Sequence, residues 1–334
     1  MTPTPIRTVE MHAGGEPVRI VVDGYPALAG DTLLAKRRDA RENHDHLRRL
    51  LMFEPRGHAD MYGVIPAEPD HPVADLAVLF MHNEGYSTMC GHATIALGRW
   101  AVDRGLVPVT EPETRVALQV PAGLVQVTVE VDGGRTGRAR FESVPAFVAA
   151  AGVPLEVAGV GTIPVDVAYG GAFYAFAPAS AFGLDVRQSP VADLVDAAWG
   201  VTTAARDTVP LRHPDDSDLN FLYGTILTDS ADEWSDQPTA NICVFADRQV
   251  DRSPTGSGVT ARIAIQHARG QIEIGQERVF ESIVGSRFTG KAVRETTVGD
   301  TPAVVVEVGG MAHYTGSCEF TVEEGDELAA FLVR

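Results

Sequence analysis

The sequence has little cysteine, no long apolar segment and few basic residues for its length. Three cysteines in 334 residues are too few for a disulfide framework and suit a reducing compartment, so we expect a cytoplasmic protein. No apolar run approaches the roughly 20 residues that span a bilayer, and residues 1–5 lack the basic and apolar stretches of a secretion signal. The formal net charge of −18 disfavours nucleic acid, because phosphate binding needs clustered Lys and Arg. We therefore expect neither a membrane nor a nucleic acid as a partner.

Signals for cofactors are also missing. The chain has no Walker loop and no Gly-x-Gly-x-x-Gly turn after a strand, which argues against nucleotide binding. The segment His44-Asp45-His46 resembles a metal pair, but a solvated face is the better interpretation in such a charged helical stretch. We expect no metal and no cofactor, and a small molecule as the partner. The sequence allows a homodimer but does not determine the oligomeric state.

The chain does contain a repeated pattern. Residues 80–105 and 245–270 align with an offset of 165 positions, close to half of the chain. In this alignment the first Phe, the central Gly and the closing Arg-Gly pair all match. Such a repeat indicates a duplicated unit, and 334 residues are long for one core. We predict two domains.

The two copies differ at their central position. The first is centred on Met-Cys-Gly-His at 89–92 and the second on Pro-Thr-Gly-Ser at 254–257, so Cys90 aligns with Thr255. A thiol can act as a proton-transfer base near neutral pH, whereas an ordinary threonine hydroxyl cannot. We expect function to depend on this difference.

Hydrophobic periodicity predicts the elements around the repeat. Residues 93–102 and 259–268 are apolar nearly all round, so both should be buried helices, ended by Gly105 and Gly270. Charges with leucines at helical spacing predict an exposed helix at 35–52. Other predicted elements are a helix at 191–199, strands around a turn within 118–131, and a strand, a turn and a final apolar strand within 319–334.

Cys90 is the first candidate for chemistry. It stands just before the first buried helix, where unpaired N–H groups and the positive end of the helix dipole lower a cysteine pKa. Gly91 lets the backbone approach a ligand, and the turn Gly256-Ser257-Gly258 is its equivalent in the second copy. Together these turns offer backbone donors suited to a carboxylate. The alternative is that Cys90 is a small buried hydrophobic residue, but its repeated context favours function.

Two neighbours of these turns are further candidates. Asp251 could receive a cationic amine, and the alternative is a structural pair with Arg252 that caps the loop. His92 follows Cys90 by two positions, but adjacency in sequence does not supply the contact of a catalytic Cys–His pair. We interpret His92 as a donor lining the site, with a capping role at the helix start as the alternative.

The chain resembles the proline racemase family throughout its length. The combination of Met-Cys-Gly-His at 89–92 with Asp-Arg-Ser-Pro-x-Gly-x-Gly at 251–258 is highly specific. Further matching segments lie at 11–19, 56–63, 80–92, 169–171 and 285–288.

The resemblance implies an α+β protein with two pseudo-symmetric domains of diaminopimelate-epimerase-like fold. Each domain would be a strongly curved β-sheet around a central helix, with the active site in the cleft between the domains. We place the first domain at 1–135 plus 319–334, because the tail is expected to return to it, and the second at 136–318. The implied site residues are the base Cys90, Asp251 at the ring nitrogen of the substrate, and Gly91, His92, Thr255, Gly256 and Ser257 around the substrate.

The resemblance also narrows the activity. Racemases and epimerases of the family use two cysteines on opposite faces of the substrate Cα, and Thr255 stands where the second belongs. This departure resembles the branch of trans-3-hydroxy-L-proline dehydratases and predicts a cofactor-free hydro-lyase with Cys90 as the single acid–base. Thr255 would position water or substrate, or fill space. The alternatives are a 4-hydroxyproline epimerase or proline racemase and, from another class, a non-catalytic amino-acid-binding protein. Side activities and the metabolic pathway are not determined.

Overall fold

The computed structural model describes residues 5–333, which form two compact units. The first unit holds the chain up to Ala139 and again from Met311 onward, and the second holds residues 140–310. Among the described residues, no helix is long and apolar enough to cross a membrane.

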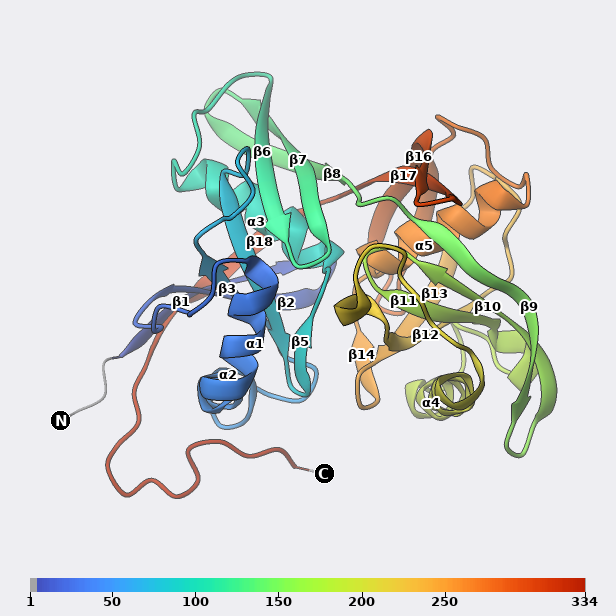
Figure 1. Cartoon of the computed structure of the whole chain (residues 1–334), viewed down its shortest axis with the longest axis horizontal. Helices are drawn as coiled ribbons and strands as arrows, with labels where there is room; N and C mark the ends of the chain where they lie inside the picture. Colours follow the sequence, from blue (N-terminus) through green and yellow to red (C-terminus); the bar gives the residue numbers. More distant parts are fainter. Residues whose placement is uncertain (1–4, 334) are drawn as a thin grey trace. The chain divides into compact units, whose positions relative to one another are not determined.

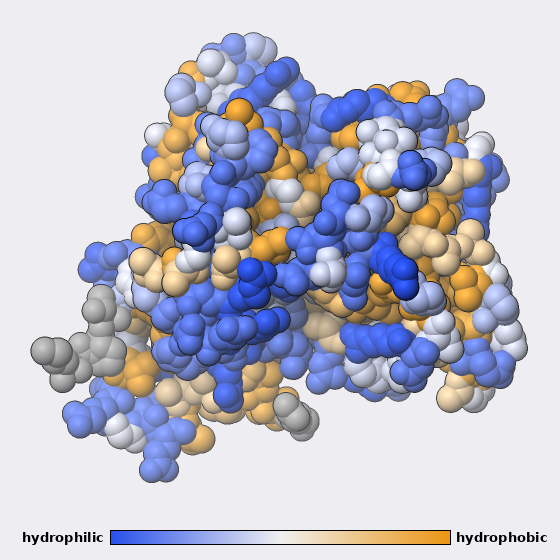
Figure 2. All heavy atoms as spheres, viewed as in Figure 1, coloured by the Kyte–Doolittle hydropathy of each residue, from blue (hydrophilic) through white to orange (hydrophobic). Residues whose placement is uncertain are grey.

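The first unit is a mixed sheet around helix α3 (Gly91–Asp103), which contacts strands from both ends of the unit's sequence (Figure 1). Helices α1 (Leu33–Asn43) and α2 (Asp45–Met52) bury apolar residues, such as Ala40 of α1 and Leu51 of α2, in a cluster with strand residues such as Met81. Hydrophilic side chains gather over these two helices (Figure 2). The strands are β1 (Ile6–Ala13), β2 (Glu16–Asp23), β3 (Tyr62–Ala67), β4 (Leu76–His82), β5 (Gly85–Ser87), β6 (Glu113–Val120), β7 (Gly123–Asp132), β8 (Arg135–Glu142), which ends in the second unit, and β18 (Ala312–Phe320).

The second unit is a mixed sheet around helix α5 (Gly256–Ala268). Helix α4 (Val191–Thr208) and the short 3₁₀ turns η1 (Ala179–Phe182) and η2 (Ser217–Leu219) lie between strands in sequence. The strands are β9 (Phe147–Val157), β10 (Gly161–Tyr169), β11 (Phe173–Pro178), β12 (Leu222–Thr228), β13 (Thr239–Phe245), β14 (Gln249–Asp251), β15 (Arg278–Glu281), β16 (Arg287–Val298) and β17 (Thr301–Gly310).

The two units pair their strands in the same order. In the first, β1 is antiparallel to β18 and β2, β2 is parallel to β3, β3 is antiparallel to β4, and β4 pairs with β5 and, in parallel, with β6. In the second, β10, β11, β12, β13, β14 and β15 repeat these pairings, with β9 in the place of β18. The duplication visible in the sequence is therefore also a duplication of topology.

Both predicted buried helices are confirmed, and they end in the same way. Gly105 has φ +66° and its N–H donates to the carbonyl of Val102, while the N–H of Leu106 donates to that of Ala101. At the end of α5, Gly270 has φ +70° and makes the matching bond to His267. This is the Schellman arrangement, in which a residue with positive φ ends the helix and glycine bears the least strain.

Three sequence predictions need correction. The helix predicted at 35–52 is two helices that meet at His44, and the helix predicted to end at 199 runs to Thr208, because Val209 precedes a proline and leaves the helical region. The final strand within 319–334 is absent from the described residues. After Phe320 there is only an isolated bridge of Phe331 with Glu54, and the Arg56 guanidinium takes the carbonyls of Thr321 and Ala329. Arg334 lies outside the described residues.

Candidate active site

Cys90 is the N-cap residue of α3. Its backbone is extended, with φ −145° and ψ 111°, and its Sγ accepts a hydrogen bond from the N–H of Ala93 at 3.4 Å. The side chain is buried, with 5% exposed. A sulfur in this position lies among the free N–H groups of the first helical turn, which favour the thiolate. The predicted helix-start location of Cys90 is confirmed.

His92 contacts the same sulfur. Its Nδ1 lies 3.2 Å from Cys90 Sγ, and its Nε2 lies 3.3 Å from the carbonyl oxygen of Pro17. A carbonyl only accepts, so Nε2 carries a proton and Nδ1 is the atom that exchanges a proton with the sulfur. The neutral ring can accept from the thiol, and the imidazolium can donate to the thiolate. Adjacency in sequence did not predict this contact.

The ring of His92 is held by an aromatic neighbour. Tyr62 packs against it edge to face, with ring centroids 4.9 Å apart, and stacks on His82 at 6.0 Å. The Tyr62 hydroxyl in turn makes a short hydrogen bond with Ser87. These contacts fix Tyr62 and so limit the rotation of His92 beside the sulfur.

The equivalent position in the second unit has a different geometry. Thr255 is the N-cap of α5 with φ +63° and ψ 91°, a left-handed conformation that strains a β-branched residue. Its side chain is 4% exposed, and its Oγ1 makes no hydrogen bond with any residue within 5–333. The loop holds this conformation through two bonds: Ser253 Oγ accepts from the Thr255 N–H at 3.1 Å, and Asn241 donates to the Pro254 carbonyl at 3.1 Å.

Ser257 and Asp251 flank this turn. The Ser257 hydroxyl bonds to the Tyr174 hydroxyl at 2.7 Å. Burial raises the pKa of Tyr174 well above its usual range, so the phenol stays neutral. Asp251 is 6% exposed, and its Oδ1 accepts from the N–H of Ser253 at 2.8 Å, the bond of an Asx turn.

The predicted site residues thus fall into two groups, one in each unit. Cys90, Gly91 and His92 form the start of α3, and Asp251, Thr255, Gly256 and Ser257 form the approach to α5 and its start. Within residues 5–333, no group of three or more His, Cys, Asp and Glu side chains is placed to hold a metal.

Sequence reasoning missed Tyr62, Tyr174 and the Pro17 carbonyl. Tyr62 and Pro17 lie within segments that match the family pattern, but nothing in their local sequence marks them as partners of His92. Tyr174 is separated from Ser257 by 83 positions and carries no local signal.

The family follows from comparison with known proteins. A family model described as "Proline racemase" matches residues 8–331. The chain belongs to the proline racemase family. Its α+β class and its fold are those predicted: a hydroxyproline epimerase from Agrobacterium vitis, solved with bound trans-4-OH-L-proline, has a TM-score of 0.93 at 26% identity, covering 100% of this chain and 97% of that one.

Relatives within the family are closer in sequence. A trans-L-3-hydroxyproline dehydratase from Xenopus tropicalis is 58% identical over 332 residues, covering 98% of this chain and 95% of that protein. A trans-3-hydroxy-L-proline dehydratase from Burkholderia cenocepacia is 48% identical over 330 residues, covering 98% of each. Both alignments cover nearly the whole of this chain.

Proposed function

We propose that the protein is a trans-3-hydroxy-L-proline dehydratase, a hydro-lyase that needs one acid–base residue. The observation that carries the proposal is the difference between the two helix starts. Cys90 has a sulfur that contacts an imidazole, whereas the Thr255 hydroxyl makes no hydrogen bond, and so contacts no base, among residues 5–333. The names of the relatives in Xenopus tropicalis and Burkholderia cenocepacia support the same activity.

Stereochemistry explains why one thiol suffices. In trans-3-hydroxy-L-proline the hydroxyl is trans to the carboxylate and therefore cis to Hα, so both leaving groups lie on one face of the ring. The Cys90 thiolate takes Hα, the electrons of the C–H bond form the C2–C3 double bond, and the C3–O bond breaks. The same sulfur returns its proton to the departing oxygen, which leaves as water. The resulting enamine tautomerises to Δ1-pyrroline-2-carboxylate.

His92 supplies the resting thiolate in this mechanism. Its Nδ1, 3.2 Å from Sγ, accepts the thiol proton, while the Nε2–H remains on the Pro17 carbonyl. The imidazolium then stabilises the thiolate by a charge-assisted hydrogen bond. His92 thereby has a role in addition to that of a donor to the substrate.

The remaining residues bind the substrate. The backbone N–H groups at Gly91, Gly256 and Ser257 hold the carboxylate, where charge develops as Hα leaves. Asp251 contacts the ring nitrogen through the carboxylate oxygen that Ser253 does not use. Thr255 contributes a hydroxyl but no base.

A substrate panel tests the activity. Proline and the 3-hydroxy and 4-hydroxy isomers are incubated with the protein and scored for imine formation, which we expect only from trans-3-hydroxy-L-proline. Racemisation of proline at a rate comparable to dehydration would refute the role given to Thr255. Binding by calorimetry without any product would indicate a binding protein instead.

The rival activity is 4-hydroxyproline epimerisation, which the similarity in fold to the Agrobacterium vitis hydroxyproline epimerase brings into consideration. Incubation in D2O separates the two. Epimerisation gives a hydroxy acid with deuterium at Cα and no imine, whereas dehydration gives the imine.

A further inference from the structure

A cavity lies at the opposite end of α5 from Thr255. It has a volume of about 220 Å³ and is lined by Arg262 and Gln266 of α5, by its C-cap Arg269, by Asp166 of β10, and by the segment after β12 with Asp232. Gln266 follows Gly256 by ten positions on the helix, which corresponds to about 15 Å at 1.5 Å per residue. The cavity is therefore separate from the helix start that carries Thr255.

A buried amide points to a ligand in this cavity. Gln266 is 1% exposed, and neither its Oε1 nor its Nε2 makes a hydrogen bond with a residue of the described chain. Buried side-chain amides are nearly always bonded, because leaving both a donor and an acceptor unpaired is costly. A ligand that both donates and accepts would satisfy this side chain.

Charges of both signs surround the amide. The Arg262 guanidinium is 2% exposed and donates to Asp232 Oδ1 at 2.9 Å, and Arg269 donates to Asp166 Oδ1 at 2.6 Å. Only the Oδ1 of each aspartate accepts a hydrogen bond from the described residues, and the Arg269 side chain is 40% exposed. The cavity can thus receive an ammonium at the aspartates and a carboxylate at Arg269.

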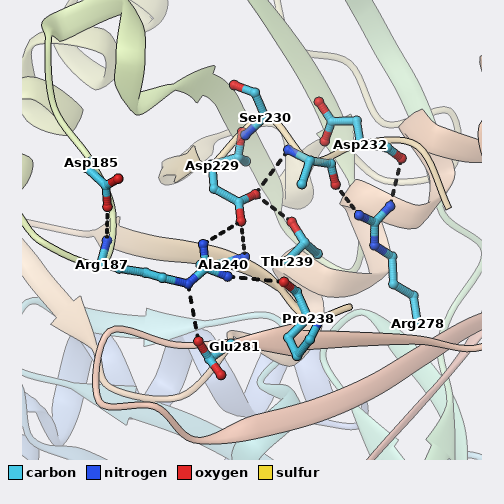
Figure 3. A network of polar contacts seen from close by, with 12 residues as sticks. Asp185, Arg187, Asp229, Ser230, Asp232, Pro238, Thr239, Ala240, Arg278 and Glu281 are labelled. Atoms are coloured by element: carbon cyan, nitrogen blue, oxygen red, sulfur yellow. Dashed lines mark hydrogen bonds and ion pairs between the residues drawn. The ribbon is translucent and has the colours of Figure 1, made fainter. Parts of the chain in front are cut away.

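The wall that carries Asp232 is held rigidly (Figure 3). Asp229 accepts from Thr239 at 2.6 Å, from the N–H of Ala240 at 2.7 Å and from Arg187 at 2.9 Å. Arg278 donates to the carbonyl of Asp232 at 2.8 Å. Burial alone would raise the pKa of Asp229, but these hydrogen bonds and the charge of Arg262 lower it to about 2, so Asp229 is ionised at neutral pH. A wall built this way is preorganised for binding.

We propose that this cavity binds a small zwitterionic α-amino acid. An isolated anion would meet Asp166 and Asp232, and an isolated cation would meet Arg262 and Arg269, whereas a zwitterion matches both signs. The cavity has a volume of about 220 Å³, which is roughly seven times the volume of one water molecule in the liquid. It therefore suits a molecule of about seven heavy atoms. Phe176 and Ile265 form an apolar wall for a short aliphatic side chain.

Hydrogen–deuterium exchange of the full chain locates the ligand. We expect L-alanine to protect residues 228–232 and 262–269, and acetate and methylammonium, which each carry one of its charges, to protect neither. Protection confined to 90–95 and 255–258 would place the amino acid at the helix starts and overturn the proposal. Equal protection by acetate or methylammonium alone would overturn the zwitterion, and no protection would overturn the site.

Variants separate the amide from the fold. Gln266→Met keeps the side-chain volume and removes the amide, and we expect about tenfold weaker L-alanine binding by calorimetry. Gln188→Met, at an exposed glutamine outside the cavity, serves as the control and should bind as the wild type does. Arg269→Gln changes a half-exposed residue and should weaken binding similarly, so the proposal remains testable if the buried variant unfolds. Unchanged affinity in the folded variants would refute it. Because this readout needs no turnover of trans-3-hydroxy-L-proline, its failure leaves the proposed dehydratase activity to its own test.

Discussion

Helices α3 and α5 occupy equivalent places in the two units, but the residues at their starts support different chemistry. Both helices run for 13 residues, contact equivalent strands and end at a left-handed glycine. At their first turns they diverge. Cys90 has extended backbone and its sulfur caps the N–H of Ala93, whereas Thr255 has φ +63° and its hydroxyl caps nothing.

The neighbours diverge as well. Two positions after Cys90, an imidazole contacts the sulfur, and two positions after Thr255, a serine bonds to the neutral phenol of Tyr174. The duplication thus conserved the packing around each helix and changed the groups at its start. Proton transfer needs a titratable atom at only one of the two starts if the reaction takes place on one face of the substrate.

Removing the thiol should have the largest effect on activity, because it removes the difference between the two helix starts. Cys90→Ser should lower the dehydration rate by about 10⁴-fold or more, because a serine hydroxyl can neither take Hα nor donate as readily to the leaving oxygen. Imine formation from trans-3-hydroxy-L-proline measures the rate, and circular dichroism checks the fold. Cys318→Ser, at a second thiol of the first unit, is the matched control and should leave the rate unchanged. Substantial activity in the Cys90 variant would mean that another base operates.

Removing the imidazole should have a smaller effect. His92→Asn keeps a polar group near the position of Nδ1 but cannot hold the thiol proton, so we expect a roughly 10–100-fold lower rate near neutral pH, the worth of one charge-assisted hydrogen bond. The rate should recover as pH rises, because solvent base then removes the thiol proton. A pH–rate profile parallel to that of the wild type would mean that His92 is only structural.

Making the two starts alike should sharpen the comparison. Thr255→Cys places a second thiol at the aligned position and should introduce exchange at Cα, seen as deuterium in recovered hydroxyproline after incubation in D2O. We expect the dehydration rate to fall only about fivefold, since the change removes the hydroxyl that Thr255 offers to the substrate, which is worth about one neutral hydrogen bond. Thr255→Ser, which keeps a hydroxyl, is the control and should show no exchange. Absence of exchange in the cysteine variant would mean that position 255 does not face Cα of the substrate.

The smallest effect concerns packing around α3. A Cβ added at Gly98 would lie 2.4 Å from Cγ1 of Val127, so Gly98→Ala should lower the free energy of unfolding by about 1–3 kcal/mol through overpacking. In the second unit the glycine is on the strand instead of the helix, since Ile263 on α5 packs against Gly290 of β16. Gly316→Ala, where a Cβ meets no atom within 4 Å, is the control for urea unfolding. Equal stability of the two variants would contradict this account.

The sequence by itself determined the duplication, the two buried helices with their glycine ends, and the difference between Cys90 and Thr255. Each of these follows from short stretches of sequence, namely apolar residues at helical spacing and a motif that is repeated 165 positions later. The missing final strand shows the limit of such patterns, since the segment after Phe320 is instead held by the Arg56 guanidinium, which donates to the carbonyls of Thr321 and Ala329.

Only the tertiary structure decided what surrounds the two central residues. Pro17 of β2 and Tyr62 of β3 contact His92 on α3, and hydrogen bonds with Ser253 and Asn241 hold the Thr255 turn at positive φ. Whether the Gln266 amide has hydrogen-bond partners likewise depends on the residues that folding places around it. The physical reason is the same in each case: a side chain's protonation, strain or lack of partners depends on neighbours that folding brings from distant positions, and no local pattern records them.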